Sequence, residues 1–397
     1  MVLLLNLMLV AAPVAGAQEA AFTVTGVVTE PDGTPVPGIH VMSADGAYFK
    51  DTTTAADGSF VVSGEEWDVE VVGSVTIGLS DYDYGAFTEP AMVGDIHYAA
   101  LLAVPVTAGA TVRADVVVSP RVTGQRAAGT IDATKKSAVA AAYRAMARDR
   151  TVRRHRYPRT GCNPGGNPQR VQRATIRVVN HYRSMAGLEP VALNADYSAK
   201  AQAAAVIMAR NRLLTHYPTR GLRCWSREGL EGASHSNLYL GVDAGWAITG
   251  YMYDPGSNNV PVGHRQWILH AGQVEMGTGD FGGANALYVV GDFAEDQVAA
   301  PALSPWPVAG WSPRREEPGG RWSVLANRSD IALDRATITV RAGGKVVASR
   351  VVHREGDRLT WQLRGRAPAR ASVTVRGATL RGVEMEPYVY LVRLFGT

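Results

Sequence analysis

The stretch that decides the fold is residues 168–194, PQRVQRATIRVVNHYRSMAGLEPVALN. Its apolar residues recur at spacings of three and four, which predicts one buried face of an amphipathic helix. Asn167 followed by Pro168 is typical of a helix cap and a first-turn residue, and Gly187 is expected to end the helix. The apolar positions are Val171, Ala174, Val178, Tyr182 and Met185.

A second helix is predicted to begin after Asn194 and to end near Leu213. Short helices are expected at 244–253 and 262–269, and strands near 273–278 and 286–293. Helices that precede strands in this way indicate an α+β domain. The face expected to be buried in the second helix carries Tyr197, Ala201, Ala204 and Met208.

Ordered motifs in this region resemble the CAP superfamily, the SCP-like domains of cysteine-rich secretory, antigen 5 and pathogenesis-related 1 proteins, in their bacterial form. The motifs are Asn180 to Val191, Leu213-Leu214-Thr215-His216, Gly263-His264-Arg265-Gln266-Trp267-Ile268-Leu269 and Met276-Gly277-Thr278-Gly279. The resemblance covers 168–300. It implies a central α-β-α sandwich with a cleft, flanked here by two small all-β sandwiches.

The family brings two histidines and two acids into its cleft, and the histidines carry over as His216 and His264. The acids carry over poorly, because Ser236 stands where many members have glutamate. The second acid could be Asp254, with Glu228 or Glu231 as substitutes. Two imidazoles with a carboxylate could hold a divalent metal such as zinc, although each histidine could equally be a structural residue.

The residues expected to line the cleft are therefore His216, Glu228, Glu231, Ser236, Asn237, Asp254 and His264. Catalytic candidates are His216, His264, Glu228 and Asp254. His235 is expected to be a loop residue. The chain has no H-E-x-x-H, G-x-S-x-G or phosphate-binding loop motif. Its one G-x-G-x-x-G, at 277–282, is followed by a strand and is interpreted as turn glycines.

Residues 1–17 are almost wholly apolar, too short to span a bilayer, and end in Ala-Gly-Ala, which is typical of a secretory signal peptide. An uncleaved N-terminal anchor is the alternative. Export permits a disulfide between Cys162 and Cys224, the only cysteines; two unpaired thiols are the alternative. No membrane span is expected after cleavage.

Residues 20–120 are predicted to be a β-sandwich, because short Val- and Thr-rich runs alternate with Asp-Gly and Pro-Gly turns. The run from Gly26 through Asp32-Gly33 and Pro37-Gly38 to Asp57-Gly58-Ser59-Phe60 resembles a carboxypeptidase regulatory-like domain. That resemblance implies a spacer or adhesion module without catalytic residues.

Residues 121–167 are expected to be a helical and Arg-rich linker, and 301–397 a C-terminal β-sandwich. The Arg-rich run, 148–161, could grip anionic polymers or lipid head groups, or could be a solvated linker. Trp306, Trp311 and Trp322 could stack on sugars, but core packing is the simpler interpretation.

The composition is that of a folded protein, with 46% hydrophobic and 19% charged residues. A net charge of +4 gives no reason to expect nucleic acid as a partner. The sequence thus favours an exported, non-catalytic protein that binds a glycan, lipid or protein ligand in the periplasm, at the cell envelope or outside the cell. A metal-dependent hydrolase and a structural adhesion protein are the alternatives. The oligomeric state is left open.

Overall fold

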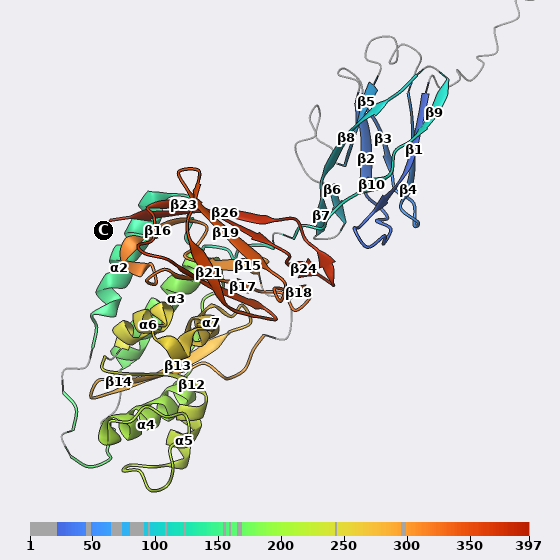
Figure 1. Ribbon diagram of the computed structural model, residues 1–397. Coiled ribbons are helices and arrows are strands. Elements are labelled where there is room, and N and C mark those ends of the chain that lie inside the picture. The colour runs from blue at the N-terminus through green and yellow to red at the C-terminus, as the bar shows by residue number, and fades with distance from the viewer. Residues whose placement is uncertain are drawn as a thin grey trace, which may run out of the picture. The chain divides into compact units, whose positions relative to one another are not determined.

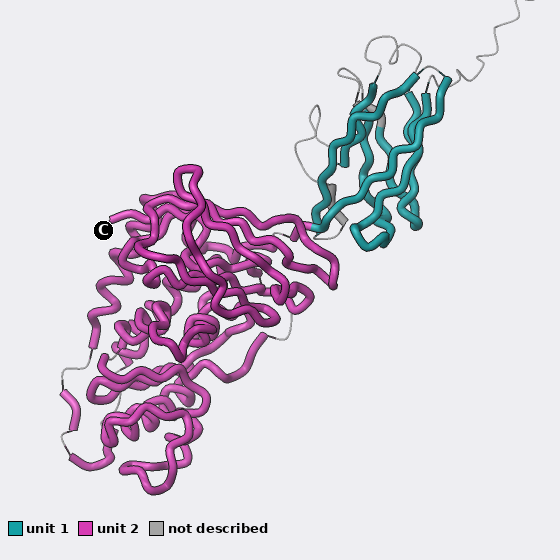
Figure 2. Tube along the Cα trace, in the orientation of Figure 1, with its two compact units in different colours: residues 1–120 teal, residues 121–397 magenta. Residues whose placement is uncertain are grey.

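The computed structural model describes residues 22–44, 49–64, 74–79, 91–93, 96–107, 109–122, 124–153, 156–158, 160–164, 169–242, 244–294 and 299–396. The chain divides into two compact units, residues 1–120 and 121–397 (Figure 2). The expected signal peptide and the Asn167-Pro168 cap lie outside the described residues.

Unit 1 consists of strands (Figure 1). One sheet has the order β10-β1-β4, with β9 also paired to β1, and the other has the order β3-β2-β5-β8. A separate ribbon joins β6 to β7. The strands are β1 Phe22–Thr29, β2 His40–Ala44, β3 Phe49–Thr53, β4 Ser59–Gly64, β5 Ser74–Leu79, β6 Ala91–Val93, β7 Ile96–Tyr98, β8 Ala100–Pro105, β9 Ala110–Arg113 and β10 Val116–Val117.

The turns of unit 1 explain why its sequence is rich in glycine. Gly33, Gly38 and Gly58 have φ values of 89°, 71° and 77°, a backbone region that favours glycine. Burial alternates strictly along β1, so that every second side chain enters the core. Phe60, which follows the last of these turns, is buried as well. The all-β character predicted for this part of the chain therefore agrees with the strands.

Unit 2 contains a sheet covered by helices on both faces (Figure 1). The sheet has the order β11-β13-β14-β12, and β11 runs parallel to β13 whereas the other pairs are antiparallel. Helices α4 and α5 cover one face, and α3, α6 and α7 lie on the other. The bounds are α2 Lys136–Arg150, α3 Gln169–Ala186, β11 Ala192–Leu193, α4 Ala195–Asn211, α5 Arg227–Ser234, β12 Ser236–Leu240, α6 Ala244–Tyr253, η1 Ser257–Asn259, α7 Gly263–Leu269, β13 Glu275–Phe281 and β14 Ala284–Tyr288.

The G-x-G-x-x-G motif lies on this sheet, where its glycines allow α4 to pack closely. A Cβ atom on Gly277 would overlap the backbone of Ser198, and one on Gly279 would overlap the backbone of Gln202. The third glycine, Gly282, has φ 56° and lies in the turn between β13 and β14. Strand β14 follows the motif, as predicted. The interpretation as turn glycines is correct for Gly282 and wrong for Gly277 and Gly279, because these two lie within β13.

The C-terminal part of unit 2 consists of sheets. Their orders are β15-β17-β22-β21, β16-β26-β23-β19-β20 and β18-β24-β25. The elements are β15 Leu303–Trp306, β16 Gly310–Pro313, η2 Arg314–Glu316, β17 Arg321–Ala326, β18 Ile331–Ala332, β19 Thr337–Ala342, β20 Lys345–Val346, β21 Ser349–Glu355, β22 Arg358–Leu363, β23 Arg370–Arg376, β24 Thr379–Leu380, β25 Val383–Glu384 and β26 Tyr388–Phe395.

One hydrophobic core joins these sheets to the helices. Trp306, Val308, Leu325 and Phe395 belong to the same buried cluster as side chains of α2, α3, α6 and α7. Helix α2, in the expected linker, packs against α3 and β16. Trp306 and Trp322 are fully buried and Trp311 is partly buried against the core, so they are packing residues. The predicted domain boundaries at 167 and 300 stay predictions, although the core continues across both.

Most predicted elements of the central region are present. Helix α3 ends before Gly187 (φ 84°), and the side chain of Asn194 accepts a hydrogen bond from the amide of Tyr197 at the start of α4. Helices α6 and α7 lie within one residue of the predicted bounds. The last two strands are displaced, because the turn between them falls at Gly282-Gly283. The chain is therefore α+β, as predicted.

Cys162 and Cys224 form a disulfide, as predicted, and they are 62 residues apart in the sequence. In the part of the chain that the structure describes, no helix is both long and apolar enough to cross a membrane.

Candidate functional site

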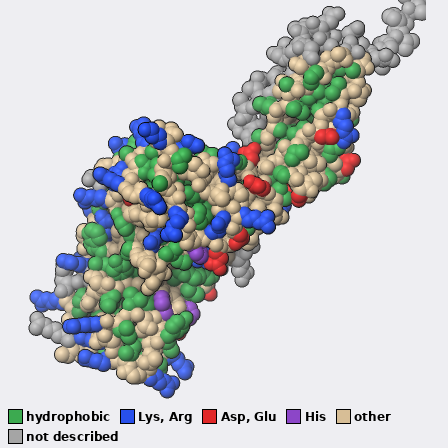
Figure 3. All heavy atoms as spheres, in the orientation of Figure 1, with side chains coloured by type: hydrophobic (Ala, Val, Ile, Leu, Met, Phe, Trp, Pro, Cys, Tyr) green, Lys and Arg blue, Asp and Glu red, His purple; other side chains and the backbone are tan. Residues whose placement is uncertain are grey.

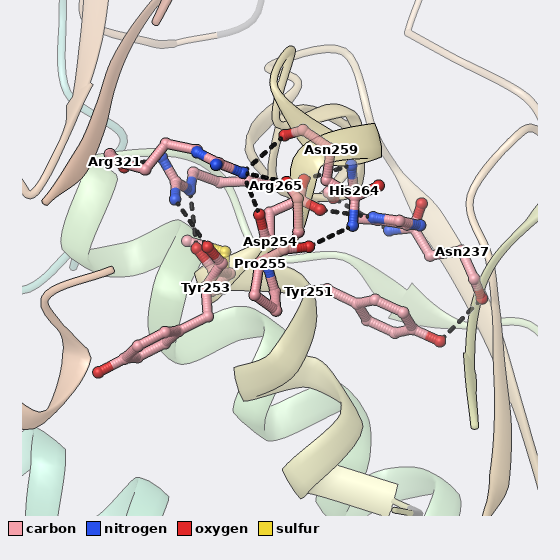
Figure 4. A network of polar contacts seen from close by, with 11 residues as sticks. Asn237, Tyr251, Tyr253, Asp254, Pro255, Asn259, His264, Arg265 and Arg321 are labelled. Carbon is pink, nitrogen blue, oxygen red and sulfur yellow. Dashed lines mark hydrogen bonds and ion pairs between the residues drawn. The ribbon is translucent and has the colours of Figure 1, made fainter. Parts of the chain in front are cut away.

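Asp254 and His264 form the centre of the site (Figure 4). The Nδ1 atom of His264 lies 2.7 Å from Oδ1 of Asp254, and Oδ2 of the same carboxylate accepts hydrogen bonds from the backbone amides of His264 (3.0 Å) and Arg265 (3.4 Å). The Asp254 side chain is inaccessible to solvent, whereas that of His264 is 24% exposed. Because the carboxylate accepts a hydrogen bond from Nδ1–H, the neutral imidazole presents an unprotonated Nε2.

The contact between Asp254 and His264 depends on the short segment that connects α6 to α7. Asp254 comes directly after α6 and has φ 47°, in the left-handed region that aspartate tolerates better than most residues. The chain then passes through η1 and returns at His264, the second residue of α7. The turn thus brings the carboxylate to the first amides of a helix, where negative charge is stabilised.

A buried aromatic residue supports the imidazole from the sheet side. The Tyr251 ring stacks on that of His264, with centroids 5.4 Å apart and an interplanar angle of 26°. Its hydroxyl donates to the backbone oxygen of Asn237 (2.9 Å) and contacts Asn285, and burial raises its pKa well above the usual range. The Asn237 amide in turn donates to the backbone oxygen of His264 (3.0 Å). The ring is therefore fixed by β12, β14 and α6 together.

Two arginines hold the segment between α6 and α7, residues 254–262, in place (Figure 4). Arg265 is completely buried, donates to the backbone oxygens of Met252 (2.8 Å) and Arg321 (3.1 Å), and donates to Oγ of Ser323 (2.9 Å). Burial lowers its pKa to about 10, and nearby Asp254 opposes that shift. Arg321, from β17, donates to the backbone oxygens of Asp254 (3.0 Å), Gly256 (2.8 Å) and Asn259 (3.3 Å). The C-terminal sheets thus hold the site in place.

His216 lies in the chain between α4 and α5 and is half-buried. Its Nδ1 is 2.9 Å from the backbone oxygen of Ala233, in α5. Because a carbonyl oxygen can only accept, Nδ1 carries the proton and Nε2 of the neutral ring is a free acceptor. Within the described residues, neither His216 nor His264 has a protein partner at Nε2.

The glutamates are placed differently from Asp254. Glu231, in α5, pairs with Lys200 of α4 at 2.6 Å, and that pairing is the main reason why its pKa is lowered. Glu228 is exposed in the first turn of α5. His235 stacks on Tyr288 with ring centroids 5.4 Å apart, and its Nδ1 contacts Ser234 and the backbone oxygen of Glu231.

The structure thus brings Asp254, Asn237 and His264 into one network, while Glu231 takes part in a separate ion pair. Ser236 is buried at the start of β12, and its hydroxyl has no hydrogen-bond partner among the described residues. The cleft as a whole and the assignment of its lining stay predictions. Tyr251 and Arg321 were missed by the sequence analysis, because nothing in their neighbourhoods marks them. Arg265 could have been suspected from its place next to His264.

Whether the two histidines fit a zinc ion depends on a third ligand. Catalytic zinc sites use three protein ligands, and the two histidines would supply two Nε2 atoms. Among the residues that the structure describes, no group of three or more histidine, cysteine, aspartate or glutamate side chains is arranged to hold a metal ion. The described residues therefore do not fit a three-ligand zinc site.

Comparison with solved structures gives low overall similarity. An extracellular protein containing an SCP domain from Bacillus anthracis str. Ames is 12% identical, with 64% of this chain and 85% of that chain covered and a TM-score of 0.24. A 9R-lipoxygenase from Cyanothece PCC8801 is 8% identical, with 95% and 43% covered and a TM-score of 0.19. A Ca²⁺-stabilized adhesin with which an Antarctic bacterium binds ice is 9% identical, with 95% and 75% covered and a TM-score of 0.16.

No curated protein matches the chain. A family model does match, over residues 176–293, and its description is CAP: Cysteine-rich secretory protein family. The matched residues run from α3 to the chain after β14, and they include His216, Asp254 and His264. Residues 176–293 of this chain are therefore a CAP domain.

Proposed function

We propose that this is an exported protein whose CAP domain binds a ligand of the cell envelope or the extracellular medium without catalysing a reaction. The surface around His216 and His264 would provide the contacts, with two Nε2 atoms as hydrogen-bond acceptors. The ligand would be a glycan, a lipid or a protein. Export is supported by the signal-like first 17 residues and by the Cys162–Cys224 disulfide, since disulfides persist in oxidising compartments.

One observation carries the non-catalytic part of this proposal: the candidate carboxylates are already engaged or exposed. Asp254 is buried and accepts from two backbone amides and one imidazole, so it has little capacity left for a substrate proton. Glu231 is paired with Lys200. A general base must reach the proton that it abstracts, and only Glu228 is both acidic and open to solvent among the candidates.

A metal-dependent hydrolase that uses the same residues is the second candidate, and one observation favours it. Histidines that bind metal usually donate their other ring N–H to a carboxylate or a carbonyl oxygen. His264 does so to Asp254 and His216 does so to Ala233. Two such rings in one domain are what a metal site would need, although a third ligand is missing among the described residues.

Calorimetric titration with zinc separates the two functions. The purified full-length protein is compared with a His216→Ala/His264→Ala variant and with a His353→Ala control, because His353 lies on β21 in the C-terminal sheets. The binding proposal predicts no stoichiometric zinc binding in any of the three. One zinc per chain, lost only in the double variant, would contradict it and would make hydrolase assays the next step.

Co-sedimentation with isolated envelope fragments at high salt, which weakens electrostatic attraction to anionic bilayers, tests binding directly. The wild type and the His353→Ala control should sediment, and the double variant should remain in the supernatant. Equal sedimentation of all three proteins would show that the histidines are not part of the contact surface.

We further propose that residues 20–120 form a carboxypeptidase regulatory-like module that acts as a spacer or adhesion domain. The strand content of unit 1, the positive φ values of its turn glycines and the buried Phe60 support this proposal. If the module is a spacer, deletion of residues 20–120 should leave the zinc and envelope results for the CAP domain unchanged. A loss of envelope binding on deletion would instead assign the adhesion to this module.

A further inference from the structure

We infer that the end of unit 2 formed by the chain between α4 and α5 docks on a lipid bilayer that contains anionic phospholipid. This docking surface consists of Leu213, Leu214 and Tyr217 with the exposed arginines Arg212, Arg220, Arg223 and Arg227. It flanks His216 but does not include the Asp254–His264 network, and the inference does not need that network to bind anything.

Basic residues are concentrated in two segments of the sequence, and the second of these contains the docking surface. Nine arginines and no acidic residue occur between Arg150 and Leu188, and five arginines, one lysine and no acidic residue occur between Tyr197 and Arg227. The whole chain has 40 basic and 36 acidic residues, so the rest of it carries 25 basic and 36 acidic ones. The modest net charge of +4 therefore conceals two strongly basic segments and an acidic remainder. Arg183 in the first segment is buried and Arg177 pairs with Asp149, so these two do not contribute to the docking surface.

The fold brings the two acid-free segments together. The Cys162–Cys224 disulfide joins them, and Arg210 donates to the backbone oxygen of Pro158 (2.8 Å). Tyr157 also packs against Phe281, with ring centroids 5.3 Å apart. On the face shown in Figure 3, Lys and Arg side chains surround the end of unit 2 that carries α4 and α5, and no acidic side chain is visible there.

Apolar side chains project into solvent from the same surface. Leu213, Leu214 and Tyr217 are 44%, 46% and 76% exposed, on the two sides of His216. Neighbouring apolar residues that stay exposed indicate an interaction site, because their burial is favourable. The four surface arginines make no ion pair with any described residue, so their charge is available for a partner.

The loop is held in shape before any partner binds. Asn211 donates to the backbone oxygen of Arg223 (2.9 Å) and accepts from its amide (3.0 Å), which ties the two ends of the loop together. Trp225 donates to the backbone oxygen of Pro218 (3.0 Å), and Arg220 lies over the Trp225 ring at 5.2 Å. The exposure of the leucines is therefore built into a braced loop, which lowers the entropic cost of docking.

This combination favours a bilayer over a soluble polyanion. A soluble polyanion would bind the arginines, but it would gain no favourable contact from the exposed leucines. An anionic bilayer uses both, because its surface potential attracts the arginines while its interface takes up apolar and aromatic side chains. Tyrosine and tryptophan are the aromatic residues typical of that interface, and Tyr217 and Trp225 occur here.

Vesicle co-sedimentation tests the inference, with phosphatidylcholine vesicles that contain either no phosphatidylglycerol or about one third of it. The export-processed chain, from residue 18 onward, should bind only the anionic vesicles and should dissociate as salt is raised. Two variants should each weaken binding by about tenfold or more: Leu213→Ser/Leu214→Ser/Tyr217→Ser, which removes the apolar contacts, and Arg212→Asn/Arg223→Gln/Arg227→Gln, which removes charge.

Matched controls carry the same changes on the C-terminal sheets. Val346→Ser/Val389→Ser/Leu391→Ser replaces exposed apolar residues, and Arg350→Gln/Arg370→Gln/Arg376→Gln removes three exposed arginines. Both controls should bind like the wild type. Each variant is first shown by circular dichroism and thiol titration to be folded and disulfide-bonded.

Two results would overturn the inference. One is that the export-processed chain fails to sediment with anionic vesicles at low salt. The other is that the serine triple variant binds as well as the wild type while polyphosphate displaces both, which would assign the arginines to a soluble polyanion. Loss of zinc or envelope binding in the histidine variants, with vesicle binding intact, would concern only the proposed function.

Discussion

At the scale of single residues, the most informative group is Asp254. A buried carboxylate is stable only when it is paired and hydrogen-bonded, and Asp254 meets both conditions through His264 and two backbone amides. The same contacts decide which nitrogen of His264 carries the proton. The residue is thus both a structural anchor of the turn after α6 and the determinant of the chemistry that His264 can offer.

Asp254→Asn should change the tautomer of His264 while leaving the backbone in place. Asparagine tolerates the left-handed conformation of residue 254 (φ 47°), and its amide group can donate to Nδ1. The proton of His264 is then expected on Nε2, and unfolding should become easier by about 1–3 kcal/mol because charged hydrogen bonds are lost. Nitrogen-15 NMR of the imidazole rings reports the tautomer. His216 is the internal control, since its partner is a backbone oxygen.

If His264 keeps its proton on Nδ1 in the variant, the carboxylate does not determine the tautomer and the role assigned to Asp254 is wrong.

At the scale of elements, the backbone of α4 lies directly against the backbone of β13, without side chains between them. Gly277 and Gly279 alternate with Thr278 along β13, and both face the α4 backbone. Such contact needs residues without a Cβ, which explains why a strand contains glycines that would otherwise weaken it.

Gly279→Ala should therefore destabilise unit 2 by about 1–3 kcal/mol, because the added methyl group overlaps the backbone at Gln202 and must push α4 outward. Urea unfolding measures the change as a lower midpoint. Gly221→Ala is the control, since a Cβ there meets nothing within 4 Å. Equal midpoints for the two variants would mean that α4 can shift without cost.

Arg321 couples two elements that are distant in sequence, because β17 donates to three backbone oxygens of the segment before α7. Arg321→Met should increase amide hydrogen exchange in residues 254–262 by tenfold or more, which corresponds to about 1.4 kcal/mol, near one lost charged hydrogen bond. The control is Arg341→Met, whose guanidinium bonds within its own hairpin. Unchanged exchange in 254–262 would show that Arg265 is sufficient to hold the segment.

The sequence predicted the helices and site residues that a local pattern marks, and it missed those that depend on tertiary contacts. The spacing of Val171, Val178 and Met185 predicts helix α3, and Asn194 predicts the cap of α4. Helix α5 was missed because Gly229 and Gly232 lower its helix propensity; a Cβ on Gly232 would overlap the backbone of Lys200. At the site, His216, Asp254 and His264 were named, whereas Arg321 acts through a tertiary contact that no local pattern encodes.

At the scale of the whole molecule, the hydrophobic core defines what can fold alone. Trp306, Val308, Leu325 and Phe395 come from beyond residue 300, and they share a buried cluster with the helices of the CAP domain. Residues 121–397 form one compact unit and residues 1–120 another. The CAP match itself ends at 293 and omits these four side chains.

Truncation at the two positions should thus have opposite effects. A chain of residues 121–397 keeps the whole core and should unfold in urea with the midpoint of unit 2 in the full chain. A chain of residues 121–300 loses four buried apolar side chains, each worth about 1.5–3 kcal/mol of burial, and together they are comparable to the whole stability of a typical domain. It should lack a cooperative transition. A cooperative 121–300 fragment, which lacks Arg321, would show that the sheets merely lie on a CAP domain that is stable without them.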